Sequence, residues 1–282
     1  MQPLIIRETA FHWGNWGDRT YIMGILNTTP DSFSDGGQFN TLETAIQQAH
    51  RMVRDGADIL DIGGQSTRPG AETISLAEEL SRTIPVIEAL RRELNIPISI
   101  DTTRAEVARK AVEVGADWVN DISGGTFDPL MLPTVAQLGV PIILMHLRGT
   151  PQTMQQLTDY EDLIPDIQQF FEHQIQQALN FGIPKTHLIL DPGIGFAKTI
   201  SQNLDLIRQL SQFRSLDLPL LVGPSRKSFI GHILQQPEPQ QRVWGTGAAC
   251  CAAIANGADI LRVHDVAEMV QVCRMADAIW RY

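Results

Sequence analysis

Short apolar runs alternate with amphipathic segments along almost the whole chain. Three stretches share one wording: DGADILDIGG at 55–64, VGADWVNDISGG at 114–125 and NGADILRVHD at 256–265. In each, a glycine precedes the apolar run, which is typical of the C-terminal cap of a helix. The apolar run then ends in polar residues. The pattern indicates a repeated unit in which a helix leads into a buried parallel strand.

Extending this pattern gives eight strands. They are expected at about 21–27, 58–63, 97–102, 117–122, 141–146, 187–192, 219–223 and 259–264. Segments with apolar residues at helical spacing lie between them, at about 42–53, 76–93, 104–114, 161–180, 201–212 and 266–280. Eight consecutive units of about 30 residues favour a closed (β/α)₈ TIM barrel over an open doubly wound sheet.

The eight units account for most of the chain, which favours a single barrel domain. No linker or low-complexity stretch interrupts it, so residues 1–282 are interpreted as a single domain. The residues before Tyr21 are expected to form a short β-hairpin that closes the bottom of the barrel, with Gly14 and Gly17 in its turn. No Gly-x-Gly-x-x-Gly follows the first strand, which argues against a dinucleotide-binding sheet.

Composition and charge narrow the classes of function. The chain has 32 acidic and 22 basic residues and a net charge of −10, so nucleic acid and an anionic membrane surface are unfavourable partners. It contains no signal peptide pattern and no apolar stretch of about 18 residues that could span a membrane. Cys250, Cys251 and Cys273 lie in apolar helical stretches and are interpreted as buried thiols in a reducing compartment. The sequence thus indicates a soluble cytoplasmic protein.

Polar residues stand where the predicted strands end, the face at which barrels of this type carry their active sites. They are Asn27, Asp61, Asp101, Asn120, Asp121, His146, Asp191, Lys227, Arg262 and His264. Any one of these residues alone could have a structural role. Asp61 or Asp121, for example, could simply bond loop amides. A whole ring is costly to bury without partners, so it predicts a functional site.

The ring divides into two kinds of chemistry. One group contains Asp101, Asn120, Asp191 and Lys227. Its carboxylates and amide suit the donor edge of a planar heterocycle, and its ammonium could donate to a carbonyl or ring nitrogen. The other group contains Arg262, His264, Arg68 and Asn27, which suit a phosphate group. A heterocycle and a diphosphate together suggest displacement of pyrophosphate.

Eight segments, in order, resemble the dihydropteroate synthases of folate biosynthesis. They are MGILNTTPDSFSDGG (23–37), DIGGQSTRPGA (61–71), SIDTTRAEVA (99–108), VNDISGG (119–125), LMHLRGTPQTMQ (144–155), LDPGIGFAK (190–198), LVGPSRKSFIG (221–231) and RVHD (262–265). The resemblance implies condensation of 6-hydroxymethyl-7,8-dihydropterin diphosphate with 4-aminobenzoate, giving 7,8-dihydropteroate and pyrophosphate. It also implies Mg²⁺ as cofactor and a target for sulfonamides.

The resemblance also implies roles for single residues. It places Asp101, Asn120, Asp191 and Lys227 in the pterin pocket, with Met145 and Phe196 as walls. It places Asn27, Arg262 and His264 at the diphosphate, and Asn27 at the Mg²⁺ position. It places Thr67, Arg68, Pro69, Ser228 and Phe33 around 4-aminobenzoate. Catalytic roles fall to Asp101, Asp35, Lys227 and Arg262. Gln65 departs from the family motif, which usually has Glu there.

Two other functions share parts of this pattern. A pterin-dependent methyltransferase has the barrel and the pterin pocket, but it needs neither a diphosphate site nor the STRPG and SRKS loops. A catalytically inactive pterin-binding protein should lack one of the four residues Asp101, Asp191, Lys227 and Arg262, and all four are present.

The C-terminal segments predict an interface. Segment 245–256, GTGAACCAAIAN, has small or apolar residues on every side, whereas a barrel helix normally shows one polar face to water. Together with 266–280 it predicts a homodimer through the C-terminal helices, which the resemblance also implies. The alternative cover for this helix is the first 20 residues of the same chain.

Overall fold

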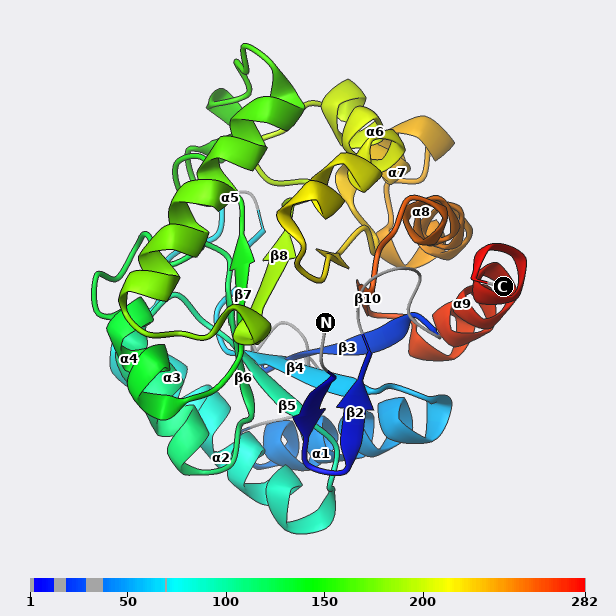
Figure 1. The fold of residues 1–282 in the computed structure, drawn as a ribbon. Helices are drawn as coiled ribbons and strands as arrows, with labels where there is room; N and C mark the ends of the chain where they lie inside the picture. Colours follow the sequence, from blue (N-terminus) through cyan, green and yellow to red (C-terminus); the bar gives the residue numbers. More distant parts are fainter. Residues whose placement is uncertain (1–2, 13–18, 29–37, 69, 282) are drawn as a thin grey trace.

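Eight parallel strands form the centre of the computed structural model, which describes residues 3–12, 19–28, 38–68 and 70–281. Helices surround the strands (Figure 1). In chain order the strands are β3 (Tyr21–Asn27), β4 (Ile59–Gly63), β5 (Ile98–Asp101), β6 (Trp118–Asp121), β7 (Ile142–Met145), β8 (Leu188–Asp191), β9 (Leu221–Val222) and β10 (Ile260–Val263). Each lies within an apolar run that the sequence predicts as a strand.

The sheet closes into a barrel. Its strand order is β8-β7-β6-β5-β4-β3-β10-β9, with parallel pairing between neighbours. A parallel bridge between Leu190 and Leu220 joins the two outermost strands of this order. The fold is therefore the (β/α)₈ barrel predicted from the repeat, and a closed sheet of this kind directs the carboxyl ends of all its strands to one face.

The helices follow the predicted periodicity where they are long. They are α1 (Gln38–Asp55), α2 (Leu76–Glu93), α3 (Ala105–Glu113), α4 (Met131–Leu138), α5 (Leu163–Asn180), α6 (Ile200–Arg208), α7 (Ser228–Leu234), α8 (Val243–Ala255) and α9 (Val266–Trp280). The sequence did not predict α4 and α7, because each is too short to show a helical period. The helix predicted at 201–212 ends at Arg208 and continues as a 3₁₀ turn, Leu210–Leu216. None of the helices in the described ranges is long and apolar enough to cross a membrane.

An antiparallel hairpin closes the bottom of the barrel, as predicted. It consists of β1 (Leu4–Ile6) and β2 (Thr9–Phe11), and it lies across one end of the barrel in Figure 1. Leu4 and Phe11 pack in one cluster with inward-facing strand residues such as Met23 and Trp118. The prediction for its turn was wrong. The chain turns at Arg7 and Glu8, where Arg7 has a φ of 54° and pairs with Asp117 at 2.8 Å, while Gly14 and Gly17 lie outside the described residues.

Strand register sets the level of the polar residues at the opposite end. Asn27 is paired with Gly63, Gly63 with Asp101, and Asp101 with Asn120. The last residues of β3, β4 and β5 and the second-to-last residue of β6 thus lie at one level of the mouth. The apolar residues below them are buried between sheet and helices.

Candidate active site

A single arginine joins two carboxylates across the mouth of the barrel. Arg262, on β10, donates from Nη2 to Oδ2 of Asp101 on β5, at 2.6 Å. Its Nε donates to Oδ2 of Asp61 on β4, also at 2.6 Å. Burial alone would lower the pKa of Arg262, but the Asp61 and Asp101 carboxylates raise it above its usual value. The guanidinium therefore stays charged at every physiological pH.

Asp61 connects the two groups of polar residues predicted from the sequence, because it contacts one member of each. The Oδ2 atom that accepts from Arg262 also accepts from Nδ2 of Asn120 at 3.0 Å. The side chain is completely buried, and its Oδ1 has no hydrogen-bond partner among the described residues. From the sequence alone, Asp61 could serve only to bond loop amides. The structure shows that Asp61 instead accepts hydrogen bonds from Asn120 and Arg262 and so holds both side chains at the mouth.

Asp121 does bond loop amides. Its Oδ1 accepts from the backbone N–H of Ser123 at 2.8 Å, and its Oδ2 accepts from that of Gly125 at 2.9 Å. These bonds fix the turn after β6 and leave its carboxylate with a structural role. The two aspartates of similar sequence context therefore differ in function because only one of them faces the barrel axis and Arg262.

Asp191 is held by a sharp turn after β8. Its Oδ1 accepts from the backbone N–H of Gly193 at 2.8 Å. Gly193 has a φ of 73°, and a Cβ there would lie 2.1 Å from the carbonyl oxygen of His146, so no other residue fits this turn. Burial raises the pKa of Asp191 to about 6, against the lowering effects of the Gly193 hydrogen bond and Lys227. The carboxylate is ionised at neutral pH.

Lys227 follows β9 and lies above an aromatic ring. Its Nζ is 4.0 Å from the ring centroid of Phe196, a distance typical of a cation–π contact. Burial and the positive charge of Arg262 together lower the pKa of Lys227 to about 8, while Asp191 and Asp101 oppose the shift. Phe196 and Met145 are 8% and 2% exposed and form apolar walls beside these charges. The arrangement suits a flat, polar-edged ligand.

His264 is a neutral side chain among cations. Its Nδ1 lies 3.0 Å from Oγ of Ser225. Burial, together with the positive charges of Arg226, Arg262, Lys227 and Arg68, lowers the pKa of His264 to about 3. The anion site suggested by the sequence therefore draws its positive charge from arginines and lysine, and His264 can contribute only a neutral hydrogen bond.

A buried lysine that sequence reasoning missed supports the Asp191 turn. Lys198 donates to the carbonyl oxygen of Phe196 at 2.9 Å and lies 3.2 Å from Nδ1 of His146. It is 3% exposed, and burial lowers its pKa to about 7. Burial also lowers the pKa of His146, so this imidazole is neutral. His146, which the sequence predicts at a strand end, is thus a contact of the buried Lys198.

A cavity of about 360 Å³ opens beside Asp101. The loop between β4 and α2 supplies Gln65, Thr67 and Thr73 to its lining, and Ile122 lies on the side toward β6. Arg68 is exposed in this loop, and Ser228 is exposed at the start of α7. Three predicted site residues, Phe33, Asp35 and Pro69, lie outside the described residues.

Metal binding rests on one predicted residue, Asn27, at the carboxyl end of β3. Within the described ranges, His, Cys, Asp and Glu side chains form no cluster of three that could hold a metal ion. Mg²⁺ commonly takes only one or two protein ligands and completes its shell with water and substrate phosphates. A lone amide oxygen at the mouth fits that kind of site and does not fit a metal cage built by the protein alone.

Comparison with known proteins gives one consistent result. The sequence pattern of the family described as pterin binding enzyme matches residues 23–264. The dihydropteroate synthase of Synechocystis is 67% identical over 279 residues, which cover 99% of this chain and 96% of that protein.

Solved structures agree with the sequence comparison. A dihydropteroate synthase of Clostridium difficile, crystallised in the presence of pteroic acid, superposes with a TM-score of 0.90 at 46% identity and covers 95% of this chain and 100% of its own. The Yersinia pestis dihydropteroate synthase in a sulfonamide drug complex superposes with a TM-score of 0.92 at 44% identity, covering 99% of both chains.

Proposed function

The chain belongs to the dihydropteroate synthases of the pterin-binding enzyme family, and we propose that the polar ring at its barrel mouth carries out that family's reaction. The enzyme condenses 6-hydroxymethyl-7,8-dihydropterin diphosphate with 4-aminobenzoate to give 7,8-dihydropteroate and pyrophosphate. One observation supports the assignment of the site above all others. Arg262 bridges Asp61 and Asp101, so an anion-binding cation and a heterocycle-binding carboxylate form one unit.

The pterin ring would bind edge-on between carboxylates. Asp191 and Asn120 would face the amino and ring N–H groups, because carboxylate and amide oxygens accept from such an edge. Lys227 would donate to the carbonyl or a ring nitrogen. Met145 and Phe196 would pack on the ring faces, and their burial supports this role.

The diphosphate would lie toward Arg262. The Nη1 atom of this guanidinium is not used in its bonds to Asp61 and Asp101, so it can donate to a phosphate oxygen. His264 would add a neutral N–H. Asn27 would hold Mg²⁺ together with the diphosphate oxygens. When bound, that ion offsets the negative charge that grows on the leaving oxygens.

In the proposed reaction, pyrophosphate leaves the pterin before the amine of 4-aminobenzoate attacks. The bond between the exocyclic CH₂ and the diphosphate oxygen breaks, its electron pair leaves with pyrophosphate, and the reduced ring donates into the developing cation. Asp101, an acceptor beside the ring, stabilises that cation. The amine of 4-aminobenzoate attacks the same carbon, and its proton leaves with pyrophosphate. No covalent bond to the protein forms.

The second substrate would enter through the loops above Asp101. Thr67, Arg68 and Ser228 would enclose 4-aminobenzoate together with Pro69 and Phe33, and Asp35 would take a catalytic role. The cavity beside Asp101 supports this placement, because Thr67 lines it. Enclosure matters chemically, since water would otherwise compete with a weak aniline nucleophile.

Pyrophosphate release tests the proposal directly. Purified protein with Mg²⁺ and the pterin diphosphate should release pyrophosphate at a rate that depends on 4-aminobenzoate. Asp101→Asn should abolish pyrophosphate release while leaving the fold intact, because the developing cation loses the carboxylate that stabilises it. No release from the wild type would refute the proposal and favour an inactive pterin-binding protein. Release that does not depend on 4-aminobenzoate would refute the condensation and indicate hydrolysis of the pterin diphosphate instead.

We also propose a homodimer through α8 and α9. An apolar groove of about 460 Å³ lies between these helices, lined by Trp244, Ala248, Cys251, Met275 and Ile279 among others. Trp244 is 82% exposed and Met275 64%, which is unusual for such large apolar side chains. A second copy of this face would bury them.

The three cysteines are free thiols, which suits a reducing compartment, and we propose a cytoplasmic location.

A further inference from the structure

A buried glutamate on α2, the helix that follows the loop after β4, connects this helix to the end of β5, the strand that carries Asp101. Glu79, in the first turn of α2, is 2% exposed. Its Oε1 accepts from Oγ1 of Thr102 at 2.6 Å, and its Oε2 accepts from Nη1 of Arg104 at 2.6 Å. Thr102 directly follows Asp101 in the chain. A charge this deeply buried needs both partners, so it fixes their positions.

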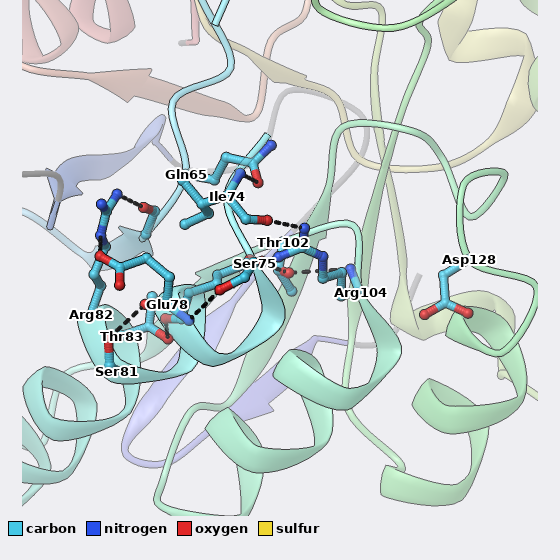
Figure 2. A network of polar contacts seen from close by, with 12 residues as sticks. Gln65, Ile74, Ser75, Glu78, Ser81, Arg82, Thr83, Thr102, Arg104 and Asp128 are labelled. Atoms are coloured by element: carbon cyan, nitrogen blue, oxygen red, sulfur yellow. Dashed lines mark hydrogen bonds and ion pairs between the residues drawn. The ribbon is translucent and has the colours of Figure 1, made fainter. Parts of the chain in front are cut away.

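Arg104 carries the connection on to the loop itself. Its Nη2 donates to the carbonyl oxygen of Ile74 at 2.5 Å, near the end of the loop 64–75 (Figure 2). Ile74 in turn donates its N–H to Oε1 of Gln65 at 3.4 Å. At the start of the loop, Arg82 donates to the carbonyl oxygen of Gly64 at 3.1 Å. The start of the loop is therefore tied to Arg82 of α2, and its end is tied to Arg104.

The same residues form a wall of the cavity beside Asp101. Thr67 and Thr73 line it from the loop and Asp101 lines it from β5. Glu79 and Arg104 also line it, and they bond to both sides, through Thr102 next to Asp101 and through Ile74 of the loop. The separation between the loop and the Asp101 carboxylate is thus set by the Glu79–Arg104 pair.

We propose that Glu79 and Arg104 are positioning residues that hold Thr67 and its loop at the correct place for 4-aminobenzoate. The inference rests on the proposed function, in which this loop encloses the second substrate. Neither residue acts on the reacting atoms. Their contribution is to keep the amine in line with the carbon that it attacks, because small displacements of a reactant are costly in rate.

Arg104→Lys is the sharpest test. A lysine keeps a positive charge for Glu79, but its single ammonium cannot reproduce a planar fork that bonds a carboxylate and a carbonyl at once. The KM for 4-aminobenzoate should rise about tenfold, the effect of losing one charge-assisted bond that positions the loop. The KM for the pterin diphosphate should change less than about twofold, because the Arg104 side chain bonds to Glu79 and to the Ile74 carbonyl and to no residue of the proposed pterin pocket.

Arg91→Lys is the matched control. Arg91 lies in the last turn of α2, at the opposite end of this helix from Glu79. It donates to Oδ2 of Asp117 at 2.6 Å and to the carbonyl oxygen of Gly115 at 2.9 Å, so it bonds one carboxylate and one backbone carbonyl group, as Arg104 does. Its substitution should lower the melting temperature comparably and leave both KM values unchanged. Amide hydrogen exchange should accelerate within 64–75 in Arg104→Lys and not in Arg91→Lys.

The outcomes separate cleanly. An active wild type with an unchanged KM for 4-aminobenzoate in Arg104→Lys overturns the inference alone. Equal changes in both KM values also overturn it, because they indicate a general loss of structure. A wild type that never consumes 4-aminobenzoate overturns the proposed function instead, whatever the variants do.

Discussion

Arg262 and Asp101 form a 2.6 Å ion pair across the barrel mouth although 161 positions separate them in the chain. The arginine that would bind the leaving diphosphate therefore also neutralises the carboxylate that would face the developing cation. Burial raises the pKa of Asp101, and Arg262 opposes that shift. A change at either residue alters the other.

Arg262→Ala should weaken binding of the pterin diphosphate at least tenfold more than binding of the free pterin alcohol, about the effect of losing a charge-assisted bond to phosphate. Calorimetric titration with both ligands measures the difference. Arg148→Ala is a suitable control, since Arg148 is a partly exposed arginine of the β7 loop that pairs with Asp159. Equal losses for both ligands in Arg262→Ala would show that the residue is only structural.

Asp191→Asn should cost at least about 2 kcal/mol of pterin binding, because it presents an amide donor to the donor edge of the ligand. Asp259→Asn is a matched control. Asp259 is a buried carboxylate that accepts from the backbone N–H of Leu220 at 2.9 Å, but it precedes β10, at the opposite end of the barrel. It should affect stability and not affinity. Unchanged calorimetric binding in Asp191→Asn would contradict the pterin assignment.

4-Aminobenzoate should bind measurably only after the pterin site is filled. Thr67 lines a cavity that shares Asp101 with the proposed pterin pocket, so bound pterin would complete one of its walls. Fluorescence or calorimetric titration of the empty protein should give no signal, and addition of pterin with pyrophosphate should create one. Tight binding to the empty protein would show that the two sites are independent.

Lys198 should make stability rise with pH. Its pKa falls to about 7 in the folded protein, so above pH 7 the native state holds fewer protons than the unfolded state and gains stability. Relative to Lys198→Met, the wild type should gain up to about 1.4 kcal/mol per pH unit between pH 7 and the usual lysine pKa of about 10.4. Below pH 7 the lysine is protonated in both states, and the difference should be flat. Urea unfolding at several pH values measures it, and a flat difference above pH 7 would contradict the lowered pKa.

Met275→Glu should dissociate the proposed dimer, since it places a charge in the apolar groove between α8 and α9. Leu130→Glu serves as the control, because Leu130 is 62% exposed at the start of α4, away from that groove. Light scattering at micromolar concentration distinguishes the two. Ala253 is unsuitable for this test because it is buried in the core of its own chain. A monomeric wild type would refute the dimer.

The repeat in the sequence determined the barrel and its ring of strand ends. Parallel strands buried on both faces read as continuous apolar runs, and the first polar residue after each run marks the mouth. Asn27, Asp101, Asn120 and Asp191 could be found this way. The short helices α4 and α7 could not, because one or two turns contain too few residues to show a period.

Only the tertiary structure decided which polar groups act together. Asp61 and Asp121 look alike in sequence, yet one supports Arg262 and Asn120 while the other bonds its own turn. His264 is a potential cation in sequence and a neutral ring once it is buried among arginines. Glu79 and Lys198 occupy ordinary helix and loop positions in sequence. Their roles depend on partners distant in the chain, because hydrogen bonds and desolvation are set by which side chains closure of the barrel brings together.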